Sequence, residues 1–328
     1  MPSDALETTI SAEEQDAIRA RIRQVMATRG MAQTDVSRQI GIPHGTFSPW
    51  LTGKYGGRTS PIAEQALKWL NTLDAAERTS IFAPRVPAFV ATRTGREIFD
   101  ALEHAQHMPE FVVVTGAPGV GKTSAAKAYK ARSSNVWMVT AEPAMSTPRG
   151  LLDELGDAVG VQERGLSSHR LSRAVARRMT GTGGLVLIDE GQHLPSQVLD
   201  QLRVLYDLAG IGIALMGNET IFARLEGGTR AAQYAQLFSR VGMRVQRPRP
   251  LKDDIDALLT AWGVEGKRER TLMHAVARKP GALRNLTKCL QLAHMTAGGE
   301  GAEAMDETHI LMAAKRLGID VQPQAVAE

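Results

Sequence analysis

Two stretches of the chain carry side chains whose types and spacing suit chemistry on a phosphate group. The first runs Gly116-Ala-Pro-Gly-Val-Gly-Lys-Thr123 and matches the pattern G-x-x-x-x-G-K-[ST] at every fixed position. Glycines let backbone N–H groups turn toward phosphates, and the positive end of a following helix strengthens the site. We expect Lys122 to reach the β- and γ-phosphates of a nucleotide and Thr123 to offer its hydroxyl to Mg²⁺. The residues predicted to bind the nucleotide here are Gly116, Ala117, Pro118, Gly119, Val120, Gly121, Lys122, Thr123 and Ser124.

The second stretch, Leu185-Val-Leu-Ile-Asp-Glu190, is an apolar run that ends in two carboxylates. Open α/β sheets bind ligands at the carboxyl ends of their strands, where these two side chains would lie. We expect Asp189 to hold Mg²⁺, directly or through water, and Glu190 to polarise the attacking water. The pair alone is a weak signal because strands often end in Asp. It becomes a strong one together with the glycine-rich loop upstream.

Three further polar residues stand where a hydrolytic site would use them. Asn218 follows the apolar run Ile211–Met216 and could orient the water, although a plain turn at the strand end is the alternative. Arg240 lies between a helix-like and a strand-like stretch, and Arg284 stands near the start of a C-terminal helix. Arg240 could reach the γ-phosphate of a nucleotide held by a neighbouring subunit. Arg284 could reach back to the phosphates in its own subunit when the helical lid closes. For each arginine the alternative is a solvated surface side chain.

The elements that must position these residues can be predicted from hydrophobic patterning. Short apolar runs indicate strands at Phe111–Val114, Val136–Thr140, Leu185–Ile188, Ile211–Met216 and Val241–Val245. Helix-like stretches lie between them at 123–132, 148–159, 168–180 and 196–209. Strands that alternate with helices favour a parallel sheet covered on both faces. The fold class is therefore an α/β P-loop core, flanked by all-helical segments on either side.

The composition and the hydrophobic patterning of the sequence change along the chain, and these changes indicate its domains. Two prolines make residues 81–92 look like a linker. The expected division is a helical domain at 1–80, the linker at 81–92, the nucleotide-binding domain at 93–250 and a helical lid at 251–328.

The N-terminal segment predicts a helix-turn-helix. Residues 33–40 form a short amphipathic helix with Val36 and Ile40 inward, a turn follows at Gly41-Ile-Pro43, and 44–51 form a second helix. Nine basic and nine acidic residues within 1–80 cancel, which argues against strong DNA binding by this segment alone, and a structural or protein-contact role is the alternative. The residues expected to face DNA are Gln33, His44, Thr46, Ser48 and Lys54.

Basic side chains elsewhere point to a polyanionic partner. Residues 230–290 hold 13 Lys and Arg against 5 Asp and Glu. Thr147 and Arg149 belong to the loop after the second predicted strand, and three arginines recur at i, i+3 and i+7 on one helix face. A solvated basic face is the alternative. The predicted phosphate contacts are Thr147, Arg149, Arg170, Arg173 and Arg177.

Several classes of protein are disfavoured by what the sequence lacks. No apolar run approaches the roughly 18 residues of a membrane span, and the acidic N-terminus does not look like a signal peptide. A lone cysteine, Cys289, excludes an intramolecular disulfide and a multi-cysteine zinc site. We therefore expect a cytoplasmic protein, in a bacterium or a phage-infected host, with no membrane partner.

Together, the motifs stand in the order found in AAA+ ATPases. More narrowly, the chain resembles the transposition regulators related to the B protein of phage Mu, over roughly residues 90–316. That family usually has Asp-Glu-Ala-Gln-His-Leu, and here Gly191 replaces the alanine. The segment 33–51 also resembles the DNA-binding domains of phage repressors. The stretches that carry the likeness are Val-Thr-Gly-Ala-Pro-Gly-Val-Gly-Lys-Thr123, Ile-Asp-Glu-Gly-Gln-His-Leu194, Leu-Phe-Ser-Arg-Val241 and Pro-Gly-Ala-Leu-Arg284.

The resemblance implies a specific activity. Such proteins bind ATP with Mg²⁺, assemble as helical filaments on double-stranded DNA with little sequence preference, and deliver that DNA to a transposase. The transposase stimulates hydrolysis and release. Two alternatives stay open. A secretion or motor ATPase acting on protein shares the Gln-His signature, but such proteins often carry a membrane or peptidoglycan-binding region that this sequence lacks. A nucleotide-sensing transcription regulator would not need Glu190.

Overall fold

The computed structural model describes residues 10–81, 89–163, 165–221 and 240–322. The chain divides into two compact units, Met1–Ala83 and Pro84–Glu328. None of the helices in the described ranges combines the length and the apolar composition that a membrane-spanning segment needs.

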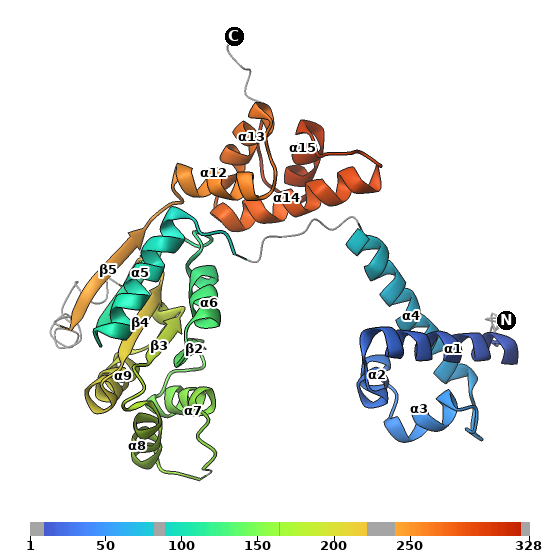
Figure 1. Ribbon diagram of the computed structural model, residues 1–328, viewed down its shortest axis with the longest axis horizontal. Coiled ribbons are helices and arrows are strands. Elements are labelled where there is room, and N and C mark those ends of the chain that lie inside the picture. The colour runs from blue at the N-terminus through green and yellow to red at the C-terminus, as the bar shows by residue number, and fades with distance from the viewer. Residues whose placement is uncertain (1–9, 82–88, 164, 222–239, 323–328) are drawn as a thin grey trace, which may run out of the picture. The chain divides into compact units, whose positions relative to one another are not determined.

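The first unit is a bundle of helices (Figure 1) with α1 at Ala12–Arg29, α2 at Gln33–Ile40, α3 at His44–Leu51 and α4 at Ser60–Ile81. A capping box between Ser11 and Glu14 begins α1, and Gly41, with φ of 83°, makes the tight turn between α2 and α3. The predicted helix-turn-helix is confirmed. Val36 is buried as expected, whereas Ile40 is only half-buried. The core of this unit includes Ile22, Val36, Phe47, Trp50 and Leu70.

A sheet of five parallel strands, counted within the described residues, forms the centre of the second unit. Its order is β2-β3-β4-β1-β5. The predicted parallel sheet is confirmed, and the strands differ from the predicted ones by at most two residues at either end. Their bounds are β1 Phe111–Gly116, β2 Val136–Thr140, β3 Leu185–Asp189, β4 Gly212–Gly217 and β5 Val241–Arg247.

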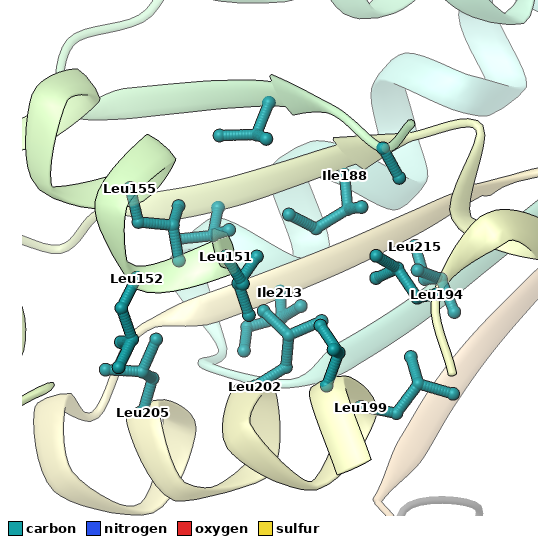
Figure 2. Close-up of a cluster of buried hydrophobic side chains, with 14 of the residues drawn as sticks. Leu151, Leu152, Leu155, Ile188, Leu194, Leu199, Leu202, Leu205, Ile213 and Leu215 are labelled. Carbon is teal, nitrogen blue, oxygen red and sulfur yellow. The ribbon is translucent and has the colours of Figure 1, made fainter. Parts of the chain in front are cut away.

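Helices cover both faces of this sheet. Side chains of one face of β1, β3 and β4 pack with α7–α9, and Figure 2 shows the leucines of α7 and α9 against Ile188, Ile213 and Leu215. The alternate side chains, among them Val112, Val114 and Leu187, pack with α5 and α6. Helix α5 was not among the predicted helices. The bounds are α5 Arg93–His107, α6 Lys122–Arg132, α7 Pro148–Val159, α8 Ser168–Met179, the short 3-10 helix η1 Gly191–His193 and α9 Ser196–Ala209.

The C-terminal part is helical, as predicted, and has a core of its own around Leu259, Met273 and Leu286. Its helices are α12 Lys252–Ala261, α13 Lys267–Ala277, α14 Ala282–Gly299 and α15 Glu307–Arg316. A buried carboxylate joins it to the sheet domain, because Asp254 accepts hydrogen bonds from both the backbone N–H and the hydroxyl of Thr94 at the start of α5.

Candidate nucleotide-binding and hydrolysis site

The glycine-rich loop joins β1 to α6 and is packed too closely for larger residues. Gly119 and Gly121 have φ of 86° and 103°, which glycine adopts without strain. A Cβ on Gly119 would lie 2.0 Å from the carbonyl oxygen of Gly281, and one on Gly116 would lie 2.3 Å from that of Arg247. The loop is therefore held between the end of β5 and the start of α14.

Lys122, the first residue of α6, lies in a half-buried position. Its Nζ donates to the carbonyl oxygens of Gly116 and Ala117 at 2.8 and 3.1 Å. Burial lowers the pKa of Lys122 and Arg284 adds to that effect, while Asp189 and Glu190 oppose it. Negative oxygens brought next to this ammonium group would offset the cost of its burial, as expected for a phosphate ligand.

Thr123 and Asp189 meet at the carboxyl edge of the sheet. The Thr123 hydroxyl donates to Asp189 Oδ2 at 2.7 Å, and Asp189 is almost completely buried at the end of β3. Mg²⁺ prefers oxygen ligands and is commonly bound by one or two protein groups plus substrate phosphates and water. This hydroxyl and carboxylate therefore fit a magnesium ion that also contacts a nucleotide.

Glu190 and Asn218 lie on the same cleft and are bridged by a residue that was not predicted for the site. Gln192 Nε2 donates to Glu190 Oε2 at 2.6 Å, and its Oε1 accepts from the Asn218 backbone N–H at 3.2 Å. The Asn218 side chain in turn accepts from the backbone and hydroxyl of Thr220. The sequence marked Gln192 only as part of a family signature.

The cleft has a volume of about 460 Å³ and is lined by the phosphate loop and by α12 and α14. Arg284 is exposed at this lining, and the backbone N–H of Leu283 donates to the carbonyl of Gly119 at 3.1 Å. The helical lid and the phosphate loop are thus in direct contact.

Part of the cleft lining is apolar and aromatic, which suits a planar base. Phe89, Val90, Leu258 and Trp262 line it. Phe89 and Val90 belong to the stretch predicted as linker, yet Phe89 stacks on Phe99 with the ring centres 5.3 Å apart. In the sequence, the sign that Phe89 packs against the domain is its position shortly before Thr92, the residue that caps α5.

Arg240 lies at the amino ends of the strands, whereas the phosphate loop lies at their carboxyl ends. Its carbonyl accepts from the Phe111 N–H, at the first residue of β1, and β1 and β5 run parallel. The length of β1, about 17–20 Å, therefore separates Arg240 from the phosphate loop of its own chain. Its guanidinium pairs with Asp207 on α9 at 3.3 Å. The helix predicted just before Arg240 lies outside the described residues.

The candidate DNA contacts of the sheet domain differ in whether their side chains already bond to other residues of the chain. The Thr147 hydroxyl caps α7, and Arg149 Nε bonds both carboxylate oxygens of Asp153, which raises the pKa of Arg149. Arg149 also donates to the Leu166 carbonyl. Three arginines of α8 are exposed and make no ion pair with any residue in the described ranges. They are Arg170, Arg173 and Arg177.

Part of the basic surplus in 230–290 is neutralised within the chain, and residues 230–239 lie outside the described part. Arg247 pairs with Glu97, and Arg270 pairs with Asp256.

The candidate DNA contacts of the first unit lie on α3, at the start of α2 and just after α3. The most buried residues of this helix, Phe47 and Trp50, fix it in the core of the unit. Gln33 begins α2, whereas His44, Thr46 and Ser48 belong to α3 and Lys54 follows it. His44 and Lys54 are exposed, and Gln33, Thr46 and Ser48 are half-buried.

The fold and the cleft together define an AAA-type P-loop domain. A family model described as "AAA domain" matches residues 105–225, and one described as "Cro/C1-type HTH DNA-binding domain" matches 21–63. The ADP form of the Aeropyrum pernix ORC2 protein has a similar fold, with a TM-score of 0.55 and 17% identity over 72% of each chain.

Closer relatives narrow the class. A model described as "Mu B transposition protein, C terminal" matches residues 239–317. The "ATP-dependent target DNA activator B" of Escherichia phage Mu is 36% identical over 304 residues, which are 93% of this chain and 96% of that protein. The "Mu-like prophage FluMu DNA transposition protein B" of Haemophilus influenzae is 33% identical over 82% of this chain and 93% of that protein. The chain belongs to the Mu B family of transposition proteins.

Proposed function

We propose that this protein is an ATPase that binds double-stranded DNA when loaded with ATP, with little sequence preference, and delivers that DNA to a transposase. Hydrolysis of ATP drives release. The observation that carries the proposal is the cleft, in which Lys122, the Thr123–Asp189 pair and Glu190 converge beside Arg284 of the lid. The name of the phage Mu relative, a target DNA activator dependent on ATP, supports the same activity.

The residues of the cleft divide the work of hydrolysis. Thr123 and Asp189 would hold a bound Mg²⁺, which would neutralise charge on the β- and γ-phosphates. Lys122 and the loop N–H groups bind and orient the phosphates. Glu190 orients the attacking water and accepts its proton, and Asn218 lies beside it at the end of β4. We assign 1–80 as the helix-turn-helix domain, 93–250 as the nucleotide-binding domain and 251–328 as the lid. Residues 81–92 connect the first of these domains to the second.

The place of Arg240 supports assembly of several copies, as a ring or a helical filament. Because it lies at the far end of β1 from its own phosphate loop, it can act only on a nucleotide held by a neighbouring subunit. Its pair with Asp207 would then have to open or be shared when the subunits meet.

The exposed arginines of α8 support contact with DNA phosphates. Such contacts carry no sequence information, so they fit binding that is indifferent to sequence. The pairing of Arg149 with Asp153 favours Arg170, Arg173 and Arg177 over Arg149 for this role. Many copies along one duplex would add weak contacts into useful affinity. We also propose that the protein works in the cytoplasm of a bacterial host.

A DNA-binding assay with two variants tests this proposal. Lys122→Ala should abolish ATP binding, because it removes the mobile cation of the loop, and ATP-dependent DNA binding should be lost with it. Glu190→Gln should bind ATP and DNA but hydrolyse ATP at least 100-fold more slowly, the usual contribution of a general base. Equal loss of ATP binding in both variants would mean that Glu190 is misassigned. DNA binding that is unaffected by ATP would instead favour a transcription regulator. A complete absence of DNA binding would favour an ATPase that acts on protein.

A further inference from the structure

Gln192 is held in a turn that the surrounding core fixes in place. The turn η1 follows β3, and Leu194 at its end is completely buried beside Leu215 of β4 (Figure 2). Gly191 lies so close to β4 that a Cβ there would come within 2.4 Å of Leu215 Cδ1. The backbone that carries Gln192 is therefore anchored between the ends of β3 and β4.

The amide group of Gln192 joins two residues of the proposed hydrolytic site. Its Nε2 donates to Glu190 Oε2 at 2.6 Å, and its Oε1 accepts from the Asn218 N–H at 3.2 Å. An amide side chain carries a donor and an acceptor on one planar group, so Gln192 can make both bonds at once. A single side chain thus spans the carboxyl ends of two neighbouring strands.

Glu190 has a backbone that is already unusual for its residue type. Its φ of 55° and ψ of 33° are left-handed, a conformation that non-glycine residues adopt at functional sites when their surroundings enforce it. Its N–H donates to Asp189 Oδ1 at 3.0 Å, which fixes the start of the turn. Among the described residues, Gln192 is the side chain that donates a hydrogen bond to the Glu190 carboxylate.

We infer that Gln192 is a positioning residue for ATP hydrolysis. It fixes the carboxylate of Glu190 in the cleft and ties it to the backbone N–H of Asn218, so that the strand ends carrying the two residues that handle the attacking water are held together. Gln192 acts through Glu190. The inference rests on the proposed ATPase activity, and it assigns a role to the Gln of the Gln-His signature.

A double-mutant cycle in single-turnover ATP hydrolysis, with Mg²⁺ and double-stranded DNA present, tests this role. Gln192→Ala should lower the rate of hydrolysis about 10-fold, part of the 10²–10⁴-fold that a general base supplies. The ATP concentration for half-saturation should stay within about two-fold of wild type, because the contact serves the transition state rather than ATP binding. In the Glu190→Gln background, Gln192→Ala should lower the rate no further, since it acts only through the Glu190 carboxylate.

Two further variants separate positioning from stability. Gln192→Glu keeps the size of the side chain but sets a second carboxylate against Glu190, so it should slow hydrolysis at least as much as Gln192→Ala while leaving ATP binding intact. Gln197→Ala is the matched control. It removes an amide that donates to the Ser146 carbonyl at 2.8 Å outside the cleft, and it should hydrolyse ATP at the wild-type rate.

The outcomes distinguish this inference from the proposed function. If wild type hydrolyses ATP and Glu190→Gln hydrolyses it at a much lower but measurable rate, the inference fails when Gln192→Ala hydrolyses at or above the wild-type rate. It also fails when that substitution slows both backgrounds equally or changes only the affinity for ATP. A wild-type protein without hydrolysis, or with hydrolysis unchanged by Glu190→Gln, overturns the proposed hydrolytic site and this inference with it.

Discussion

The contact that attaches the helical lid to the sheet domain allows a quantitative prediction. Asp254 of α12 is fully buried and accepts three hydrogen bonds, from the N–H and hydroxyl of Thr94 and from the Leu251 N–H. The substitution Asp254→Asn preserves the shape of the side chain. It replaces one acceptor oxygen by an NH₂ group that would face donors.

The expected loss follows from those bonds. Hydrogen bonds to a charged group contribute about 1.5–3 kcal/mol each, and a buried donor left unpaired costs about 1–3 kcal/mol. The Thr94 hydroxyl can turn to accept, but a backbone N–H cannot. We therefore expect Asp254→Asn to lower the free energy of unfolding by about 3 kcal/mol, or Tm by about 6–12 °C for a unit of this size.

Thermal unfolding of the full chain measures this loss, with Asp253→Asn as control. The Asp253 side chain is 68% exposed and lies 3.7 Å from Arg93, a surface pair whose removal should change stability by less than about 1 kcal/mol. The stabilisation given by ATP should also shrink in Asp254→Asn, because Trp262 and Arg284 reach the cleft from the lid. A Tm within 2 °C of wild type would show that the joint does not depend on this carboxylate.

Three other predictions concern the nucleotide, assembly and DNA. Because burial lowers the pKa of Lys122, its charge is lost at a lower pH than that of a free lysine, so ATP affinity should fall as pH rises through that lowered pKa; affinity that is constant up to the usual lysine range would contradict this. Arg240→Ala should bind ATP normally yet lose hydrolysis that rises with protein concentration, and full, concentration-independent turnover would falsify its role in a neighbouring site. Replacing Arg173 and Arg177 by Ala should reduce the slope of log DNA affinity against log salt by about 0.9 for each DNA phosphate that is no longer neutralised. The control Arg149→Ala, whose guanidinium is paired with Asp153, should change that slope less.

The sheet and the phosphate loop could be predicted from sequence because their signals are local. An apolar β-branched run such as Phe111–Val114 marks a buried strand, and the glycines after it mark a loop that binds phosphate. The acidic pair at the end of β3 could be predicted for the same reason, because the strand and the two carboxylates are adjacent in the chain.

Other features depend on packing between distant segments and could not be predicted. The bridge from Glu190 through Gln192 to Asn218 exists because η1 is pressed against β4. The pairing of Arg247 with Glu97 likewise joins residues from β5 and α5. Phe89 looked like part of a proline-containing linker because its partner Phe99 becomes visible only once α5 is formed.

One pairing was available in the sequence and was missed. Arg149 and Asp153 are four residues apart on a predicted helix, a spacing at which opposite charges meet on one face. Applying that rule would have shown Arg149 to be less available to DNA than the three arginines of α8.

Whether ATP switches on DNA binding that ignores sequence can be measured on the intact protein. The affinity of the full chain for several duplexes of unrelated sequence is measured with ATP and Mg²⁺, with ADP and Mg²⁺, and without nucleotide. We expect tight binding only in the presence of ATP and Mg²⁺, similar for every duplex and steeply weakened by salt. Binding of equal strength without nucleotide, or confined to one duplex sequence, would contradict it and make the helix-turn-helix of the first unit the DNA reader.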